Sequence, residues 1–407
     1  MEDRECMFSG VEPALLRERV RAVVPEMIAL RHRLHRHPEP GFEEHETSRM
    51  IRECVAGTRL RLLPPFLGTD VVGDLSGKGN GPCVLLRADM DALPMQDASG
   101  ADYASLRPGW THACGHDGHT AMLLGALLVL DGLTDHFNGH VRFVFQPAEE
   151  QLGGGRELVH RGVLDVQPVP RAAFALHGWP GIATGMIAAR SGAMMAAQDR
   201  FEIVLRGRGG HAAQPDQTVD PVVLAAQVIL ALQTIVARQV APVDAAVVSV
   251  CTVQAGVATN IIPEVVRLGG TIRHFDADVR NRVIAAMDRI VQHQAAAAGG
   301  EGTLTIEPGY VALSNDAHMT ALAERVVRRT LGADAWQTLD APSMGAEDFA
   351  YYLERVPGAM LRLGVGDSQV SLHHPAYDFA DDAMENGILA LVALALETLQ
   401  DLEGCKP

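Results

Sequence analysis

The sequence is short of positive charge. Its 407 residues carry 50 acidic side chains against 34 Lys and Arg, which gives a formal net charge of -16 at pH 7 with histidine neutral. Because binding to nucleic-acid phosphates requires a basic face, this balance argues against a nucleic-acid partner. The hydrophobic content of 47% and the charged content of 21% are those of an ordinary soluble globular protein.

Long apolar segments are lacking as well. The first five residues contain no apolar core of a signal peptide, and the longest apolar run, Ala121–Leu130, is too short to cross a bilayer. The six cysteines are scattered without regular spacing, which is not typical of a disulfide framework in a chain of this size. We therefore expect a cytoplasmic protein without a membrane segment.

Short apolar strands alternate with helices in the first half of the chain. This alternation is typical of a largely parallel α/β sheet. Strands are predicted at 83–87, 141–145 and 172–176, and helices at 12–37, 45–55, from 121 and from 153. The first of these helices carries His32, His35 and His37 among arginines that would repel a cation. We interpret this stretch as a solvated basic face rather than as part of a metal site.

The pattern changes near residue 194. From there to about 307 the predicted order is strand–helix–strand–strand–helix–strand, which is the split βαβ (ferredoxin-like) arrangement. A chain of 407 residues is also too long for one typical core and suggests about two domains. We predict a catalytic domain of residues 1–193 and 308–407, interrupted by a domain of residues 194–307 for substrate capture or dimerisation.

A dense cluster of potential metal ligands lies at the start of the apolar helix. Residues 112–119 contain a thiol, three imidazoles and a carboxylate, and the core of this cluster is Cys114-Gly115-His116. Gly115 lets the backbone bend between two potential ligands. The helix N-terminus is expected to favour a thiolate over a thiol at Cys114.

Acidic residues or a histidine follow three of the predicted strands. Asp89 follows the first strand, Glu149 and Glu150 follow the second, and His177 follows the third. Open α/β sheets bind ligands outside the carboxyl ends of their strands. The Cys-Gly-His loop belongs to the same face because it precedes a helix. The sequence therefore predicts that these side chains meet at one edge of the sheet.

The donor atoms in this set suit transition metals. Sulfur, nitrogen and oxygen donors together fit zinc, manganese, cobalt or nickel and do not fit calcium or magnesium alone. Five or more donors exceed what one tetrahedral ion needs, so we expect two adjacent divalent ions, which can activate water and polarise a carbonyl. The donors are Cys114, His116, Glu150, His177 and one of His373 or His374.

The adjacent carboxylates of Glu149 and Glu150 can take two different catalytic roles. One can bind metal while its neighbour stays free as a general base. The alternative is structural, because acids are common in the first turn of a helix. Nothing in the sequence indicates a nucleophilic serine triad, and the glycines at 153–155 lack the lysine of a phosphate-binding loop. Water is therefore the expected nucleophile.

Four motifs carry a family resemblance. They are Leu86–Pro94, His112–Asp117, Gln146–Glu150 and Leu176–Pro180. With them the chain resembles the peptidase M20 family, and within it the amidohydrolases that cleave N-acyl amino acids, such as hippurate hydrolase and the auxin-conjugate hydrolases. The resemblance implies a two-metal catalytic domain interrupted by a lid domain that forms a homodimer. It also implies a small-molecule N-acyl amino acid as substrate.

The resemblance assigns roles to individual residues. It implies that Glu149 is the general base, and that His373 rather than His374 binds metal, because it follows a leucine as in the family pattern. His211 matches a lid histidine that steadies the oxyanion in a partner subunit's site, and Asn260 and Arg273 match substrate-binding positions. The metal ligands that it implies are Cys114, His116, Glu150, His177 and His373.

Asp89 and Asp91 occupy positions where the wider superfamily has a metal ligand and its orienting carboxylate. With Cys114 present, we expect both aspartates to support the ligands rather than to bind metal. Two other functions stay open. A dipeptidase or aminopeptidase would need an acid for a free α-amino group, and no dedicated one is evident. A non-catalytic metal-binding relative would have no need of a base at Glu149 beside a metal ligand.

Overall fold

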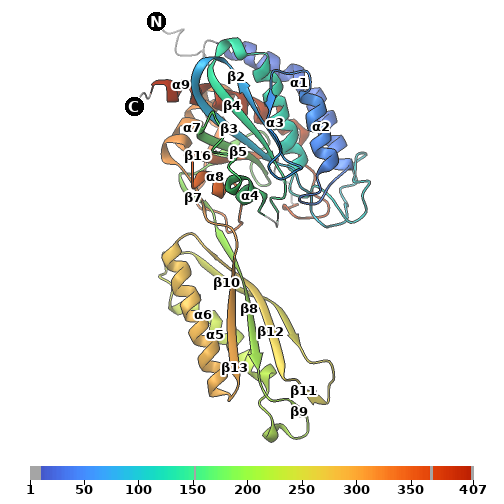
Figure 1. The fold of residues 1–407 in the computed structure, drawn as a ribbon, viewed down its shortest axis with the longest axis vertical. Coiled ribbons are helices and arrows are strands. Elements are labelled where there is room, and N and C mark those ends of the chain that lie inside the picture. Colours follow the sequence, from blue (N-terminus) through green and yellow to red (C-terminus); the bar gives the residue numbers. More distant parts are fainter. Residues whose placement is uncertain (1–10, 151–152, 367–369, 405–407) are drawn as a thin grey trace. The chain divides into compact units, whose positions relative to one another are not determined.

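The computed structural model describes residues 11–150, 153–366 and 370–404 (Figure 1). Within them the chain forms two compact units. The first unit contains the residues up to Met194, Ser314–Ala341, and the residues from Asp348 onward. The second unit contains Met195–Leu313 and Pro342–Glu347. The candidate metal ligands all belong to the first unit.

The first unit is built on an eight-stranded sheet. Its strands are β1 (Arg61–Leu62), β2 (Val71–Ser76), β3 (Lys78–Asp89), β4 (Asn138–Gln146), β5 (Pro170–Trp179), β6 (Ile187–Ala189), β15 (Trp336–Thr338) and β16 (Gly358–Gly364). The order is β1-β2-β4-β3-β5-β16-β6-β15. The central strands β4, β3, β5 and β16 are parallel, which confirms the predicted α/β class. The short β2 and β6, which the sequence did not reveal, pair antiparallel to β4 and β16.

Helices complete the first unit. They are α1 (Pro13–Arg36), α2 (His45–Val55), α3 (His116–Asp131), α4 (Gly154–His160), α7 (Ala317–Leu331), α8 (Ala350–Leu353) and α9 (Met384–Gly404). The helix α3 contacts α1, α9 and β3, and its residues are buried nearly all round. A helix enclosed in this way is apolar on every side, which explains the unbroken apolar run in the sequence. Its N-terminus is therefore held rigidly at the sheet edge.

The predicted solvated basic face on α1 is wrong for two of its residues. Arg31 and His35 are fully buried, whereas Arg33 and His37 are exposed. Residues four apart lie on the same face of a helix, and here that face points into the core. Buried charges need partners, and Arg31 finds them in three aspartates. These are Asp117, Asp378 and Asp381.

The second unit has the predicted split βαβ arrangement. Its elements are β8 (Ala197–Arg206), β9 (Gly210–His211), α5 (Pro221–Arg238), β10 (Ala246–Ala255), β11 (Ile261–Ile262), β12 (Val265–His274), α6 (Ala277–Ala297) and β13 (Glu301–Pro308). The antiparallel order is β10-β12-β8-β13, and α5 and α6 contact this sheet. The short pair β9 and β11 extends beyond the ends of β8 and β12 (Figure 1). Two further strands, β7 (Gly192–Met195) and β14 (Leu313–Asn315), occur where the chain passes between the units.

The helix α5 is more apolar than the sequence analysis recognised. By length and composition alone it could cross a membrane, with a mean hydropathy of 1.7, and 33% of it is buried in the protein. Gln227 and Gln233 interrupt its apolar residues, so the sequence of this helix contains no long unbroken apolar run. Within the described residues the free thiols are Cys54, Cys83, Cys114 and Cys251. Cys6 and Cys405 lie outside them.

Candidate metal centre

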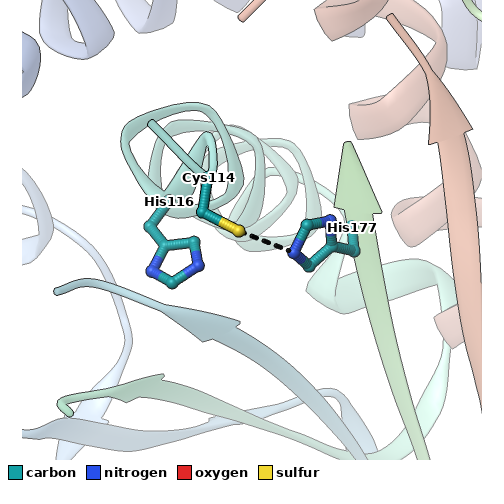
Figure 2. Close-up of side chains that lie close together, drawn as sticks. All are labelled: Cys114, His116 and His177. Carbon is teal, nitrogen blue, oxygen red and sulfur yellow. Dashed lines mark hydrogen bonds between the residues drawn. The ribbon is translucent and has the colours of Figure 1, made fainter. Parts of the chain in front are cut away.

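The Cys-Gly-His loop turns sharply into α3. Gly115 is the N-cap residue of this helix and has φ 85°, a left-handed conformation that favours glycine. A Cβ atom there would lie 3.0 Å from the Phe379 ring and 3.1 Å from the Tyr377 hydroxyl. This turn brings the side chains of Cys114 and His116 to the same side, opposite His177 at the end of β5 (Figure 2). The Cys114 Sγ lies 3.5 Å from His177 Nε2.

The hydrogen bonds of His177 leave its Nε2 available as a ligand. Its Nδ1 lies 2.7 Å from the Gly178 carbonyl oxygen, which can only accept a hydrogen bond. Nδ1 therefore carries the proton, and in the neutral ring Nε2 has the lone pair. Burial, followed by the neighbouring His119, lowers the pKa of His177 well below its ordinary value. A neutral imidazole fixed in this tautomer is the form that binds metals.

His116 is oriented in the same way by Asp91. Its Nδ1 lies 3.3 Å from Asp91 Oδ1, and its buried Nε2 has no hydrogen-bond partner in the described part of the chain. Burial lowers the pKa of His116, but Asp89 and Asp91 outweigh that effect and raise it to about 10 in the metal-free protein. A buried nitrogen without a partner is costly unless something else completes its bonding. A divalent cation at Nε2 would do so.

A strained turn between β4 and α4 presents the two glutamates. Ala148 has φ 59°, a left-handed conformation that costs a non-glycine residue roughly 1–2 kcal/mol. Two buried carboxylates accept the N–H groups of this turn. Glu44 Oε1 accepts from Ala148 N at 2.9 Å, and Asp91 accepts from Glu149 N and Glu150 N, both at 3.0 Å. The strain is therefore offset by three hydrogen bonds that fix where both glutamates point.

His373 reaches the same centre from the loop that precedes α9. It also has a positive φ, 61°, and its N–H donates to the Ala113 carbonyl at 2.8 Å. Its Nε2 lies 3.3 Å from Glu150 Oε1. His374 instead accepts the Ala376 N–H with its Nδ1, at 3.1 Å. Of the two adjacent histidines, His373 is the one near the other donors.

The donor atoms gather in overlapping groups within 4.8 Å. These groups are Cys114, His116 and His177; Cys114, Glu150 and His373; and His116, Glu149 and Glu150. Within residues 11–150, 153–366 and 370–404, neither the buried Oε1 of Glu150 nor the buried Nε2 of His116 forms a hydrogen bond. Three groups that share members fit a pair of divalent ions with mixed sulfur, nitrogen and oxygen ligands.

The predicted thiolate at Cys114 is wrong for the metal-free protein. Burial, and then the negative charges of Glu150 and Glu149, raise the pKa of this thiol well above its ordinary value. These effects outweigh the nearby helix N-terminus. The same concentration of negative charge is what a divalent cation neutralises, and a coordinated thiol is deprotonated.

His119 and Asp89 support the centre rather than offering free donors. Nε2 of His119 accepts the Gly178 N–H at 2.7 Å, so its Nδ1 carries the proton and donates to Asp89 Oδ1 at 2.6 Å. Both ring nitrogens are thus engaged, although Asp89, His116 and His119 lie close enough to form a ligand group. The other oxygen of Asp89 accepts from Arg87 Nη1 at 2.7 Å. His119 thereby ties the end of β3 to the end of β5, next to His177.

Sequence reasoning missed several residues that hold the centre in place. Asp348, which is fully buried, accepts hydrogen bonds from Arg87, Gln146 and the Gly155 N–H. Asp117 accepts from Arg31 and His35 and so ties the first turn of α3 to α1. Glu44 carried no sequence signal, because its partner is a backbone N–H more than 100 residues away.

The predicted lid residues lie at two ends of the second unit. The pairing of β9 with β11 places His211 opposite Ile261, and the Ala212 N–H donates to the Asn260 carbonyl, so His211 and Asn260 are neighbours and both are exposed. Arg273, near the other end of β12, donates to the Met344 carbonyl at 2.7 Å. The eight residue steps of β12 from Val265 to Arg273 span roughly 26 Å at 3.3 Å per strand residue. One small substrate cannot contact both ends of the same unit.

Known proteins are similar to this chain in sequence and in fold. The model of peptidase family M20/M25/M40 matches residues 85–397. An N-acetyl-L-cysteine deacetylase of Bacillus subtilis is 38% identical over 94% of this chain and 90% of its own length. An IAA-amino acid hydrolase ILR1-like 2 of Arabidopsis thaliana is 37% identical over 92% and 85%. A dinuclear metal binding peptidase from the M20 family of Bacillus subtilis has a TM-score of 0.82 and 34% identity, over 93% of this chain and 99% of that one. The chain belongs to peptidase family M20/M25/M40.

Proposed function

We propose that this chain is a metal-dependent amidohydrolase that cleaves N-acyl amino acids into a carboxylic acid and a free amino acid. The observation that carries the proposal is the set of three overlapping ligand groups, which contain two buried atoms, His116 Nε2 and Glu150 Oε1, without a hydrogen bond among the described residues. A deacetylase of an N-acetyl amino acid and a hydrolase of an amino-acid conjugate, both similar over nine-tenths of this chain, support the substrate class.

The metal ligands in this proposal come from four separate segments. Two divalent ions, of zinc, manganese, cobalt or nickel, would supply Lewis acidity toward the amide carbonyl and the attacking water. Asp91 and the Gly178 carbonyl hold two of the imidazoles in the tautomer that binds metal. The ligands are Cys114, His116, Glu150, His177 and His373.

Glu149 is the general base in this proposal. It is 6% exposed and close to His116 and Glu150, and Asp91 fixes its backbone N–H. Its carboxylate takes a proton from the attacking water and passes it to the leaving amine nitrogen. The products are then a carboxylic acid and an amine, with no covalent attachment to the protein.

The second unit supplies substrate contacts and the dimer in this proposal. His211 and Asn260 lie too far along the unit from Arg273 for one substrate to meet all three within one subunit, which favours a site shared between two subunits. The helix α5 also exposes four apolar side chains, as a dimer surface would. They are Val222, Val223, Leu230 and Val236.

The test is hydrolysis of N-acyl amino acids by the purified protein. After chelation, the chain is reloaded with zinc, manganese, cobalt or nickel and assayed on N-acetyl, N-benzoyl and indole-acetyl amino acids. A dipeptide with a free amino group is the comparison substrate. Release of free amino acid from at least one N-acyl substrate, dependent on metal and faster than dipeptide cleavage, is expected. Faster dipeptide cleavage would favour a peptidase, and no turnover with any metal would indicate a non-catalytic relative.

A further inference from the structure

Four arginines are buried in the part of the chain that the structure describes, and one of them differs from the rest. Arg31, Arg87 and Arg142 each form ion pairs with buried or partly buried aspartates. Arg362 is 6% exposed, yet its Nε and Nη2 are buried and have no hydrogen-bond partner among the described residues. Burial is the one influence on its pKa, which it lowers to about 10. No carboxylate of the described chain therefore compensates this guanidinium.

Arg362 lies beside the candidate metal centre. On β16 it pairs in register with His177 of the parallel neighbour β5. Register partners on adjacent strands are roughly 5 Å apart and project from the same face of a sheet. The Arg362 side chain therefore projects from the same face of the sheet as His177, next to this proposed metal ligand.

Trp179 fixes the plane of the Arg362 guanidinium. The Arg362 Cζ lies 3.6 Å from the centre of the Trp179 ring, and this ring lies 5.7 Å from that of His177. A guanidinium stacked on an aromatic face keeps its N–H groups free at the edge. The edge of a planar guanidinium matches a carboxylate through two parallel charge-assisted hydrogen bonds. Among the residues that the structure describes, no carboxylate pairs with these N–H groups. Together with the fixed plane, they form a binding group for a carboxylate from outside the chain.

We propose that Arg362, held by Trp179, binds a carboxylate of the substrate next to the metal centre. This inference rests on the proposed function, because the carboxylate is part of the substrate of that same site. The carboxylate belongs either to the amino-acid part or to a dicarboxylic acyl group. A buried arginine without a carboxylate partner lowers the stability of the ligand-free protein. Such a residue is expected where it binds a ligand, and is not expected where its only role is structural.

The experiment measures ligand binding to metal-free protein, so that neither the metal nor turnover contributes. N-acetyl-L-alanine, N-acetyl-L-alaninamide and N-succinyl-L-alaninamide are titrated by calorimetry into the wild type, Arg362→Met and Arg362→Lys. The control is Arg355→Met, because Arg355 is an exposed arginine whose partner is Asp165. Arg362→Met should weaken binding of a carboxylate-bearing ligand about tenfold or more and leave the alaninamide unchanged. If Arg362→Met binds N-acetyl-L-alanine more weakly, Arg362 binds the carboxylate of the amino-acid part. If it binds N-succinyl-L-alaninamide more weakly, Arg362 binds the carboxylate of the acyl group.

Thermal unfolding separates this role from a structural one. Ligand-free Arg362→Met should unfold at the same or a higher temperature than the wild type, because it removes an unpaired buried charge. The carboxylate ligand should raise the unfolding temperature of the wild type and of Arg355→Met but not that of Arg362→Met. Equal binding of both carboxylates by wild type and Arg362→Met would overturn the proposal, as would a lowered unfolding temperature with unchanged binding. Carboxylate binding that depends on Arg362 in a protein without N-acyl hydrolysis would instead refute the proposed function and leave the subsite standing.

Discussion

Glu44 gives a prediction whose magnitude can be worked from the structure. Its fully buried carboxyl accepts hydrogen bonds from the Ala148 N–H and the Thr69 hydroxyl, each at 2.9 Å. Burial, and then the charge of Asp91, raise its pKa from an ordinary value of 4.5 to about 7. Glu44→Gln keeps an oxygen to accept the Ala148 N–H and removes the ionisation. The substitution therefore isolates the effect of the buried charge.

The sign and size follow from the two pKa values. Below pH 4.5 the carboxyl is protonated in the folded and the unfolded chain alike. Between pH 4.5 and 7 the unfolded chain loses this proton while the folded chain keeps it, so the free energy of unfolding falls as the pH rises. At about 1.4 kcal/mol per pH unit, the wild type loses about 3 kcal/mol over this window, and Glu44→Gln does not. The free energy of unfolding of the variant, relative to that of the wild type, therefore rises by about 3 kcal/mol between pH 4.5 and pH 7.5.

The assay is urea unfolding of the metal-free protein at pH 4.5, 5.5, 6.5 and 7.5, followed by circular dichroism. Glu44 is the N-cap residue of α2. Glu53→Gln, at an exposed position of α2, is the control and should keep the wild-type pH dependence within about 0.5 kcal/mol. Glu44→Leu should be destabilised by about 2–5 kcal/mol at pH 4.5, because it leaves the N–H and the hydroxyl without partners. Parallel pH dependence of the wild type and Glu44→Gln would refute the reasoning.

Three further predictions concern the Cys-Gly-His loop. Cys114→Ala should lose metal, measured by elemental analysis after dialysis, and unchanged metal content would remove Cys114 from the ligands. Gly115→Ala should be destabilised by about 2–3 kcal/mol in urea, because it adds the contact with Phe379 to the left-handed strain. Gly192→Ala, with φ 76° and no atom within 4 Å of the added Cβ, should lose only about 1 kcal/mol, and equal losses would contradict the role of the contact. Metal loading at pH 7 should release about two protons, one from the Cys114 thiol and one from the His116 imidazolium, and should strengthen as the pH rises. Calorimetry in buffers of different ionisation enthalpy measures this release, and a release near zero would mean that neither group is protonated before binding.

The sequence predicted the fold class because long apolar strands and amphipathic helices carry a strong periodic signal. The strands predicted at 83–87, 141–145 and 172–176 lie within β3, β4 and β5. The strands β6 and β15 have only three residues each, which is too short for a period-two pattern to stand out. Their position depends on neighbouring strands rather than on their own composition.

The errors in the candidate site arose where tertiary contacts decide the chemistry. Arg31 and His35 looked solvated beside other basic residues, because their aspartate partners lie as many as 350 positions away. Cys114 was expected to be a thiolate from its place before a helix, but burial, and then the charges of Glu150 and Glu149 in the turn after β4, raise the pKa of its thiol. Side chains that hold distant backbone groups, such as Glu44, follow no local pattern. The roles of the ligands and of the base remain predictions.

The assignment of Glu149 as the general base is the central claim, and Glu149→Gln tests it most directly. The metal content and the hydrolysis rate of this variant are measured on the same preparation, with Glu150→Gln, which should lose metal, as the matched control. We predict that Glu149→Gln binds as much metal as the wild type and that its kcat on the best N-acyl amino acid falls by about 10²–10⁴. A fully metal-loaded Glu149→Gln protein with wild-type kcat would contradict the account.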